Sequence, residues 1–135
     1  MTAGKRAIAE LREALQRLLK DFQEAGRRGK LLLTLVAALK LREKEKPITP
    51  ASVAEEARRI IEETRGEISW GVESAQYTAA LAADLLQELV EMGVLEPGPE
   101  ILRELGRRYR FRSYGEGDAE AEARRILAPV LMKMA

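Results

Sequence analysis

The apolar residues at the start of the chain recur at alternating spacings of three and four. They are Ile8, Leu11, Leu15, Leu18, Phe22 and Ala25. This spacing places side chains on one face of an α-helix, and its seven-residue repeat is the seam along which helices pair. Glycines suited to a left-handed helix end follow at residues 26–29. The pattern predicts a first helix that packs on another helix, and five seam residues are assigned to a dimer interface: Ile8, Leu11, Leu15, Leu18 and Phe22.

Three more helices are predicted in the middle of the chain. Residues 30–44 are apolar on most of the helix circumference, so this helix is expected to be buried. Thr49 followed by Pro50 is typical of a helix start, and it opens a third helix that ends near residues 65–66. Residues 66–71 are interpreted as a turn. The fourth helix is expected from about Ser74 to Met92, with four apolar residues facing inward: Leu81, Leu85, Leu89 and Met92.

A basic segment and one more helix complete the chain. Residues 107–114 contain four arginines, two tyrosines and a phenylalanine, and they are interpreted as a strand. A final helix is predicted over residues 118–134, capped at its start by Asp118 and bent at Pro129. The sequence therefore predicts a mainly α fold.

The order of helix, helix, turn, helix and strand resembles the winged-helix group of DNA-binding domains. The resemblance rests on the end of the fourth helix, Met92-Gly-Val-Leu-Glu96, and on the Arg-rich strand that follows. It implies a winged helix-turn-helix core over residues 30–114, with the fourth helix as recognition helix. A small β wing would start at residues 94–96 and return through residues 107–114. Residues 99–106 fit either the first wing strand or a short helix capped by Gly106.

Two further resemblances concern the flanking helices and the third helix. The terminal segments, residues 1–29 and 115–135, resemble the helices that build the dimer in MarR and PadR regulators. The long third helix after Ile48-Thr-Pro50 resembles that of winged helices in archaeal replication initiators. Together they imply an N-terminal helix, a winged-helix core and a C-terminal helix that form a homodimer.

Composition narrows the chemistry. The chain has 135 residues, which is the size of one domain, and only 4% aromatics, so its core must be mostly Leu, Ile, Val and Ala. His, Cys and Asn do not occur, which removes imidazole bases, thiolate nucleophiles, disulfides and the usual zinc ligands. We therefore expect no enzyme activity, no metal and no cofactor. The same bias, with its dense Glu, Lys and Arg, is typical of thermophile proteins and of idealised designs.

The hydropathy pattern bears on location. The longest apolar run, residues 31–41, is too short to span a bilayer and is interrupted by Thr34 and Lys40. The chain starts with a charged segment, which differs from an apolar signal core. We expect a soluble cytoplasmic protein that does not bind a membrane.

Charge is segregated along the chain although the net charge is only +1. Residues 1–46 carry +6, residues 47–106 carry −8, residues 107–114 carry +4 and residues 115–135 carry −1. Such segregation can attract a polyanion to two places and repel it from a third.

The arginines of residues 107–114 are the strongest candidates for a ligand. In a strand, alternation would put three arginines on one face, namely Arg108, Arg110 and Arg112, and Tyr109, Phe111 and Ser113 on the other. A row of guanidinium groups suits successive phosphates, and with Arg107 this segment has no local acidic neighbour. The alternative is a sheet edge kept soluble by its arginines. Tyr109 among arginines would also suit stacking of single-stranded bases.

Two further groups of residues are weaker candidates. The start of the fourth helix offers Ser74, Gln76 and Tyr77 to bases, although a Gln such as Gln76 is more often plain surface. The basic cluster Arg27, Arg28 and Lys30 would grip a nucleic-acid backbone or cap a helix C-terminus. Against deep insertion in a groove, the fourth helix has no Lys or Arg and exposes four acidic residues: Glu73, Asp84, Glu88 and Glu91.

Other conspicuous residues have simpler interpretations. Trp70 is expected to anchor the core or a hinge. The paired carboxylates at residues 55–56 and 62–63 are interleaved with arginines, so a solvated, salt-bridged face is expected.

The sequence favours a non-enzymatic nucleic-acid-binding protein, with DNA preferred. Within that class we expect a small archaeal-type regulator, or an accessory factor of replication or chromatin, acting as a homodimer without a small-molecule substrate. One alternative is an interaction module that docks a basic protein through its acidic helices. The others are a binder of single-stranded nucleic acid and an idealised bundle without a ligand.

Overall fold

The central helix of the molecule is α2 (Gly29–Glu43), which is buried along most of its length. The computed structural model describes residues 3–102, 106–115 and 117–134. Leu, Val and Ala occupy most positions of α2, so nearly every face of the helix removes apolar surface from water. Its buried Thr34 hydroxyl donates a hydrogen bond to the Lys30 carbonyl oxygen at 2.8 Å. The prediction of a buried second helix is confirmed.

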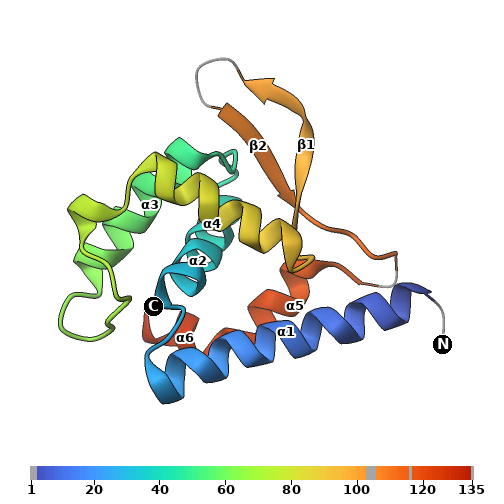
Figure 1. The fold of residues 1–135 in the computed structure, drawn as a ribbon, viewed down its shortest axis with the longest axis horizontal. Coiled ribbons are helices and arrows are strands. Elements are labelled where there is room, and N and C mark those ends of the chain that lie inside the picture. Colours follow the sequence, from blue (N-terminus) through green and yellow to red (C-terminus); the bar gives the residue numbers. More distant parts are fainter. Residues whose placement is uncertain (1–2, 103–105, 116, 135) are drawn as a thin grey trace.

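The helix α1 (Ala3–Ala25) lies along one side of the molecule and packs on α5 (Ala119–Ile126) and α2 (Figure 1). Ile8, Leu11, Leu15 and Leu18 are buried there, and the Phe22 ring stacks on Trp70 with 5.5 Å between ring centroids. Four of the five residues assigned to a dimer interface are thus buried within one chain. The apolar face of α1 packs on helices of the same chain. Its main partner is α5, which contributes three small or apolar residues: Ala119, Ala123 and Ile126.

An ion cluster fastens α5 to α1. Glu122 of α5 is only 9% exposed, and it accepts hydrogen bonds from Arg12 of α1 at 2.8 Å and from Arg125 at 2.7 Å. These bonds outweigh the effect of burial and lower the pKa of Glu122 from 4.5 to about 2. The carboxylate therefore stays charged and paired at neutral pH.

The helix α3 (Pro50–Glu63) begins as its sequence predicts. The Thr49 hydroxyl accepts a hydrogen bond from the Ser52 N–H at 3.1 Å, and the Ser52 hydroxyl accepts one from the Thr49 N–H at 2.9 Å. Pro50 occupies the first turn, where its missing N–H costs nothing. This reciprocal cap fixes where the helix starts.

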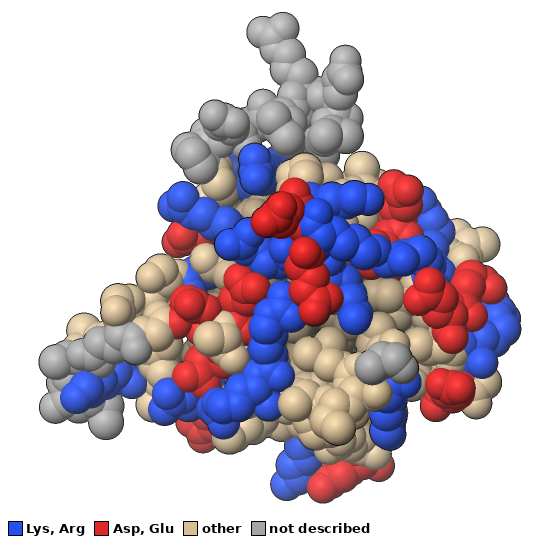
Figure 2. All heavy atoms as spheres, turned by 180° about the vertical axis from the view of Figure 1, so that it is seen from behind, with Lys and Arg blue, Asp and Glu red and all other residues tan. Residues whose placement is uncertain are grey.

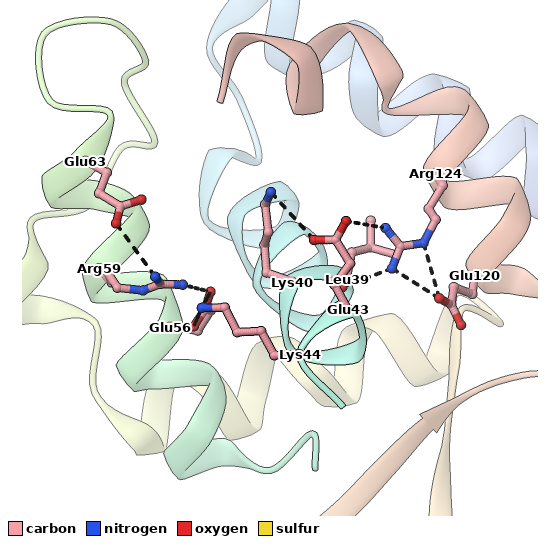
Figure 3. Close-up of polar contacts among 9 residues, drawn as sticks. All are labelled: Leu39, Lys40, Glu43, Lys44, Glu56, Arg59, Glu63, Glu120 and Arg124. Atoms are coloured by element: carbon pink, nitrogen blue, oxygen red, sulfur yellow. Dashed lines mark hydrogen bonds and ion pairs between the residues drawn. The ribbon is translucent and has the colours of Figure 1, made fainter. Parts of the chain in front are cut away.

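Two ion networks cross from α2 to its neighbours (Figure 3). Glu56 of α3 binds Lys44 at 3.0 Å and also Arg59, which in turn lies 3.7 Å from Glu63. On the other side of α2, Arg124 of α5 contacts Glu43 at 3.5 Å and Glu120 at 3.1 Å. At the end of α3, Arg65 pairs with Glu62 at 2.7 Å. The predicted salt bridges are confirmed for Glu56, Glu62 and Glu63, but Glu56 is buried and not solvated as expected.

The fourth helix, α4 (Ala79–Glu91), starts later than predicted. Thr78 caps it, accepting a hydrogen bond from the Leu81 N–H at 3.2 Å. Ser74–Gln76 instead forms a separate 3₁₀ turn, η1. The two are separated because the Tyr77 side chain turns into the core, where it hydrogen-bonds the Thr34 hydroxyl. The spacing of apolar residues does not predict that Tyr77 points into the core.

Two strands project from the helical body as a hairpin (Figure 1). β1 (Leu95–Leu102) pairs antiparallel with β2 (Gly106–Phe111), and the register sets Glu96 opposite Arg110. Of the two alternatives for residues 99–106, the strand is correct for residues 99–102, and residues 103–105 lie outside the described residues.

Several hydrogen bonds tie the base of the hairpin to the body. The Tyr109 N–H donates to the Ile48 carbonyl oxygen at 2.8 Å, so the α2–α3 loop forms a bridge with the outer edge of β2. The Tyr114 hydroxyl donates to the Gly93 carbonyl oxygen at 2.5 Å, which ties the exit of β2 to the end of α4.

The C-terminal segment forms two short helices where one bent helix was predicted. α5 ends before Leu127, and α6 (Ala128–Lys133) follows with Pro129 in its first turn. Pro129 lacks the N–H that would continue the hydrogen-bond ladder of α5, which explains the break. The Asp118 cap is confirmed, since its carboxylate accepts from the Ala121 N–H at 2.7 Å. Buried residues from α1 through α6 belong to one core, and the mainly α class is confirmed.

Candidate nucleic-acid interface

The side chains of β2 alternate between the core and solvent. Tyr109 is 7% exposed and Phe111 is half-buried, whereas Arg108 and Arg110 are exposed. Arg107 and Arg112, at either end, are exposed as well. The alternation arises because successive residues of a strand point to opposite faces and the aromatic face covers apolar core. The strand therefore presents its guanidinium groups to solvent, as its sequence predicts.

The arginines of the hairpin differ in what they contact. Arg110 donates to the Glu96 carboxylate at 2.7 Å, so the fold supplies an acidic partner to a segment that has none nearby in sequence. The partner comes from β1, directly opposite in the register, and is remote in sequence. Arg112 lies over the Tyr114 ring at 5.0 Å from its centroid. Within the described part of the chain, Arg107 and Arg108 have no ion pair.

A groove with a volume of about 550 Å³ lies at the foot of the hairpin. It is formed by the end of α2, the α2–α3 loop, β2 and the start of α5, and four cations line it: Arg42, Lys46, Arg108 and Arg110. Three carboxylates line it too, namely Glu45, Asp118 and Glu120. Figure 2, the face behind that of Figure 1, shows Lys and Arg side chains gathered over much of the surface beneath the hairpin, with acidic groups among them.

The three carboxylates of the groove differ in their contacts. Glu120 is held by Arg42 at 3.2 Å and by Arg124 at 3.1 Å, and Asp118 caps α5. Lys46, by contrast, has no ion pair among the described residues. In the described residues, the groove cations without an ion pair are therefore Lys46 and Arg108, and its carboxylates without one are Glu45 and Asp118.

The two tyrosines proposed as nucleic-acid contacts are not available for that role. Tyr77 is fully buried, and burial raises the pKa of its hydroxyl to about 12. Its carbonyl oxygen accepts from Arg58 at 2.9 Å. Tyr109 packs in the core beneath β2, and its backbone is paired with Ile48. Both assignments are corrected. Burial of each aromatic ring stabilises the fold by removing apolar surface from water.

The other candidates near α4 lie on an acidic surface. Ser74 and Gln76 belong to η1, where the Gln76 side-chain oxygen accepts from the Glu73 N–H at 3.1 Å. The exposed positions that follow on α4 include three acidic residues: Asp84, Glu88 and Glu91. In the described residues these three have no ion pair, so their charge faces solvent.

The basic cluster at the α1–α2 junction lies at the other end of the molecule from the hairpin (Figure 1). Arg27, Arg28 and Lys30 are exposed there, beside a cleft of about 360 Å³. The end of α1 is capped by backbone, since the N–H groups of Gly26 and Arg27 donate to carbonyl oxygens at 3.1 Å. Arg28 reaches the Met92 sulfur at 3.9 Å. The structure does not bring this cluster to β2.

The groove also contains residues that the sequence did not single out. Arg42 lies in the last turn of α2, Lys46 lies just beyond that helix, and Glu120 holds Arg42. The sequence signal was the net charge of +6 over residues 1–46, but only the fold places its last part beside β2.

Trp70 is confirmed as a core anchor. It is 2% exposed, and its indole N–H donates to the Thr64 hydroxyl at 2.9 Å. Its carbonyl group also lies so close to Gly29 that a Cβ there would overlap it.

Two features bear on metal binding and on membranes in the described residues. They contain no cluster of acidic residues placed to hold a metal ion. None of their helices combines the length and apolarity that crossing a bilayer requires.

Comparison of the chain with protein-family models, curated proteins and solved structures found no match. Function is therefore inferred from the geometry and charge of the candidate interface.

Proposed function

We propose that this chain is a non-enzymatic DNA-binding protein with a winged-helix arrangement. In this assignment α2, α3 and α4 are the three core helices, and β1 with β2 is the wing. The bridge between Ile48 and Tyr109 supports it, because it adds a short strand between the first and second core helices to the outer edge of β2. The most plausible biological role is that of a regulator or an accessory factor of replication or chromatin.

The observation that carries the proposal is the pair Arg107 and Arg108. Both are exposed on β2, and neither has an ion pair in the described part of the chain. The alternative role of these arginines is to keep the sheet edge soluble. That role does not explain why a cation from another segment, Lys46, lines the same groove as Arg108. Guanidinium groups bind phosphate oxygens in a bidentate manner, and each contact releases counterions from DNA.

The test is the affinity of a variant with Arg108→Ala and Arg110→Ala. We expect it to bind duplex DNA roughly tenfold more weakly at low salt, for all sequences alike, with a salt dependence reduced by about two contacts. Fluorescence anisotropy with labelled DNA at several salt concentrations measures both quantities, and circular dichroism checks the fold.

A matched control is Arg17→Ala with Arg65→Ala, which removes the same charge from two exposed arginines on other surfaces. Equal loss in both double variants would mean that net charge, and no defined site, governs binding. Absence of any binding by the unmodified protein at low salt would refute the proposal.

The proposal does not include a dimer through the α1 seam, because those side chains are buried within one chain. A homodimer through another surface remains part of it. Two copies of the hairpin would then strengthen binding through effective concentration.

A second candidate function is the docking of a basic protein on α4. It is favoured by the exposed carboxylates of Asp84, Glu88 and Glu91, which lack cationic partners among the described residues. The variant with Asp84→Asn, Glu88→Gln and Glu91→Gln should lose salt-sensitive binding to a lysine-rich peptide. Unchanged peptide binding by this variant would exclude α4 as the docking surface.

A further inference from the structure

We infer that the ligand is duplex DNA held by its sugar–phosphate backbone, without sequence readout, in the groove between β2, the α2–α3 loop and the start of α5. This inference rests on the proposed function and adds the form of the DNA and the surface that binds it. Three independent features of the molecule lead to it: where its aromatic rings lie, what α4 exposes, and which segments supply the cations.

The aromatic rings argue against single strands. Proteins that bind single strands without sequence preference stack bases on exposed aromatic side chains. The chain has one tryptophan, three tyrosines and two phenylalanines, all of them described, and none is exposed. Trp70, Tyr77 and Tyr109 are buried, and the half-buried Tyr114 ring is covered by Arg112. Phe111 lines the groove but is only half-buried, and no aromatic ring is fully exposed as a platform on which a base can stack.

The surface of α4 argues against reading of base edges. Readout in the major groove needs donors and acceptors on an element that can approach between two rows of phosphates. The exposed face of α4 instead carries Asp84, Glu88 and Glu91, which the phosphates would repel. The groove is lined by no residue of α4 or η1, so DNA bound there leaves the acidic face free.

The cations of the groove come from three different elements. Arg42 lies in the last turn of α2, Lys46 lies in the α2–α3 loop and Arg108 lies on β2. Such convergence suits a backbone, which is a continuous line of charge, better than a single small anion. Arg42 is bound to Glu120, but that carboxylate keeps Arg124 when Arg42 turns to a phosphate. The exchange therefore leaves Glu120 paired.

The experiment measures four affinities by fluorescence anisotropy at two salt concentrations. The probes are two duplexes of equal length and unrelated sequence, and a single strand of each. The variants are Arg42→Ala with Lys46→Ala in the groove, and Arg17→Ala with Lys20→Ala on the exposed surface of α1 as a control of equal charge. A third variant, Gln76→Ala with Gln87→Ala, removes the neutral hydrogen-bonding groups of η1 and α4.

We expect both duplexes to bind within about twofold of each other and single strands to bind roughly tenfold more weakly. The groove variant should lose roughly tenfold in duplex affinity and about two contacts of salt dependence, clearly more than its control. The glutamine variant should bind like the unmodified protein, and circular dichroism should show all variants folded.

Four outcomes would overturn the inference while the proposed function stands. They are tighter or equal binding of single strands, a more than tenfold difference between the duplexes, equal loss in the groove variant and its control, or weaker binding by the glutamine variant. Absence of binding to every probe at low salt would refute the proposed function itself, so the two failures are distinct.

Discussion

The α1–α5 interface and the hairpin both present arginines, but the two regions use them differently. Arg12 and Arg125 converge on one buried carboxylate, Glu122, and hold two helices together. Arg107 and Arg108 face solvent without an ion pair in the described residues. The same residue type is thus structural in one region and available to a ligand in the other. The difference is set by whether the fold brings a carboxylate to the guanidinium group.

The largest expected effect tests the structural side of the comparison. Glu122→Ala removes the carboxylate that Arg12 and Arg125 share, and we expect the free energy of unfolding to fall by about 2–3 kcal/mol. Chemical denaturation measures it. The control is Glu13→Ala, which removes an exposed ion pair with Arg17 whose charged atoms lie 3.9 Å apart. It should change the free energy of unfolding by less than about 0.5 kcal/mol. Similar losses in the two variants would mean that the Glu122 cluster is not structural.

A pH titration sharpens the same point. The pKa of Glu122 is about 2 in the folded chain, and its ordinary value is 4.5. Its stabilisation is complete above pH 4.5 and is lost as the pH falls toward 2, because the unfolded chain takes up the proton first. Between pH 5 and pH 3 the unmodified protein should lose about 1–2 kcal/mol more than Glu122→Gln. Parallel pH profiles of the two proteins, from urea unfolding, would contradict this account.

The third prediction compares one arginine from each region. Arg108→Ala should weaken duplex DNA binding roughly fivefold to tenfold and leave the melting temperature unchanged. Arg12→Ala should do the opposite, lowering the melting temperature while the folded protein retains its affinity. Anisotropy and thermal denaturation on both variants give the comparison. If either variant changed both quantities, the division between structural and binding arginines would be lost.

The smallest effect concerns the arginine that lies between the two classes. Arg110 is exposed but bound to Glu96, a cross-strand pair for which a double-mutant cycle should give about 0.2–1 kcal/mol of stability. Glu96→Ala frees Arg110 and removes a negative charge, so duplex affinity should rise about twofold. Weaker DNA binding by Glu96→Ala would show that the pair positions Arg110 for its ligand.

Sequence patterns predicted those features of the fold that depend on neighbouring residues. The Thr49 cap, the apolar α2 and the alternation along β2 follow from local hydrogen bonding and periodicity. Trp70 followed from its size and apolar surface. Each of these signals lies within a few residues, where a sequence is most informative.

The errors concern partners that are distant in sequence. The seam of α1 predicted a helical partner but not that α5 of the same chain would be that partner. The pairing of Glu96 with Arg110 depends on the register of the hairpin, and the inward turn of Tyr77 depends on Thr34 of α2. In the candidate site, the arginines of β2 were predicted, whereas Arg42 and Lys46 required the fold to bring α2 beside them.

The attachment of the hairpin base to the helical body has a consequence for the entropy of association. The Ile48–Tyr109 bridge and the hydrogen bond from Tyr114 to Gly93 fix the backbone on which Arg108 and Arg110 stand. A ligand that meets these arginines must then immobilise side chains only, since the strand is already ordered. Because less conformational entropy is lost on binding, more of the electrostatic attraction contributes to the affinity. The hairpin is then expected to associate with its ligand as a rigid body, without folding on contact.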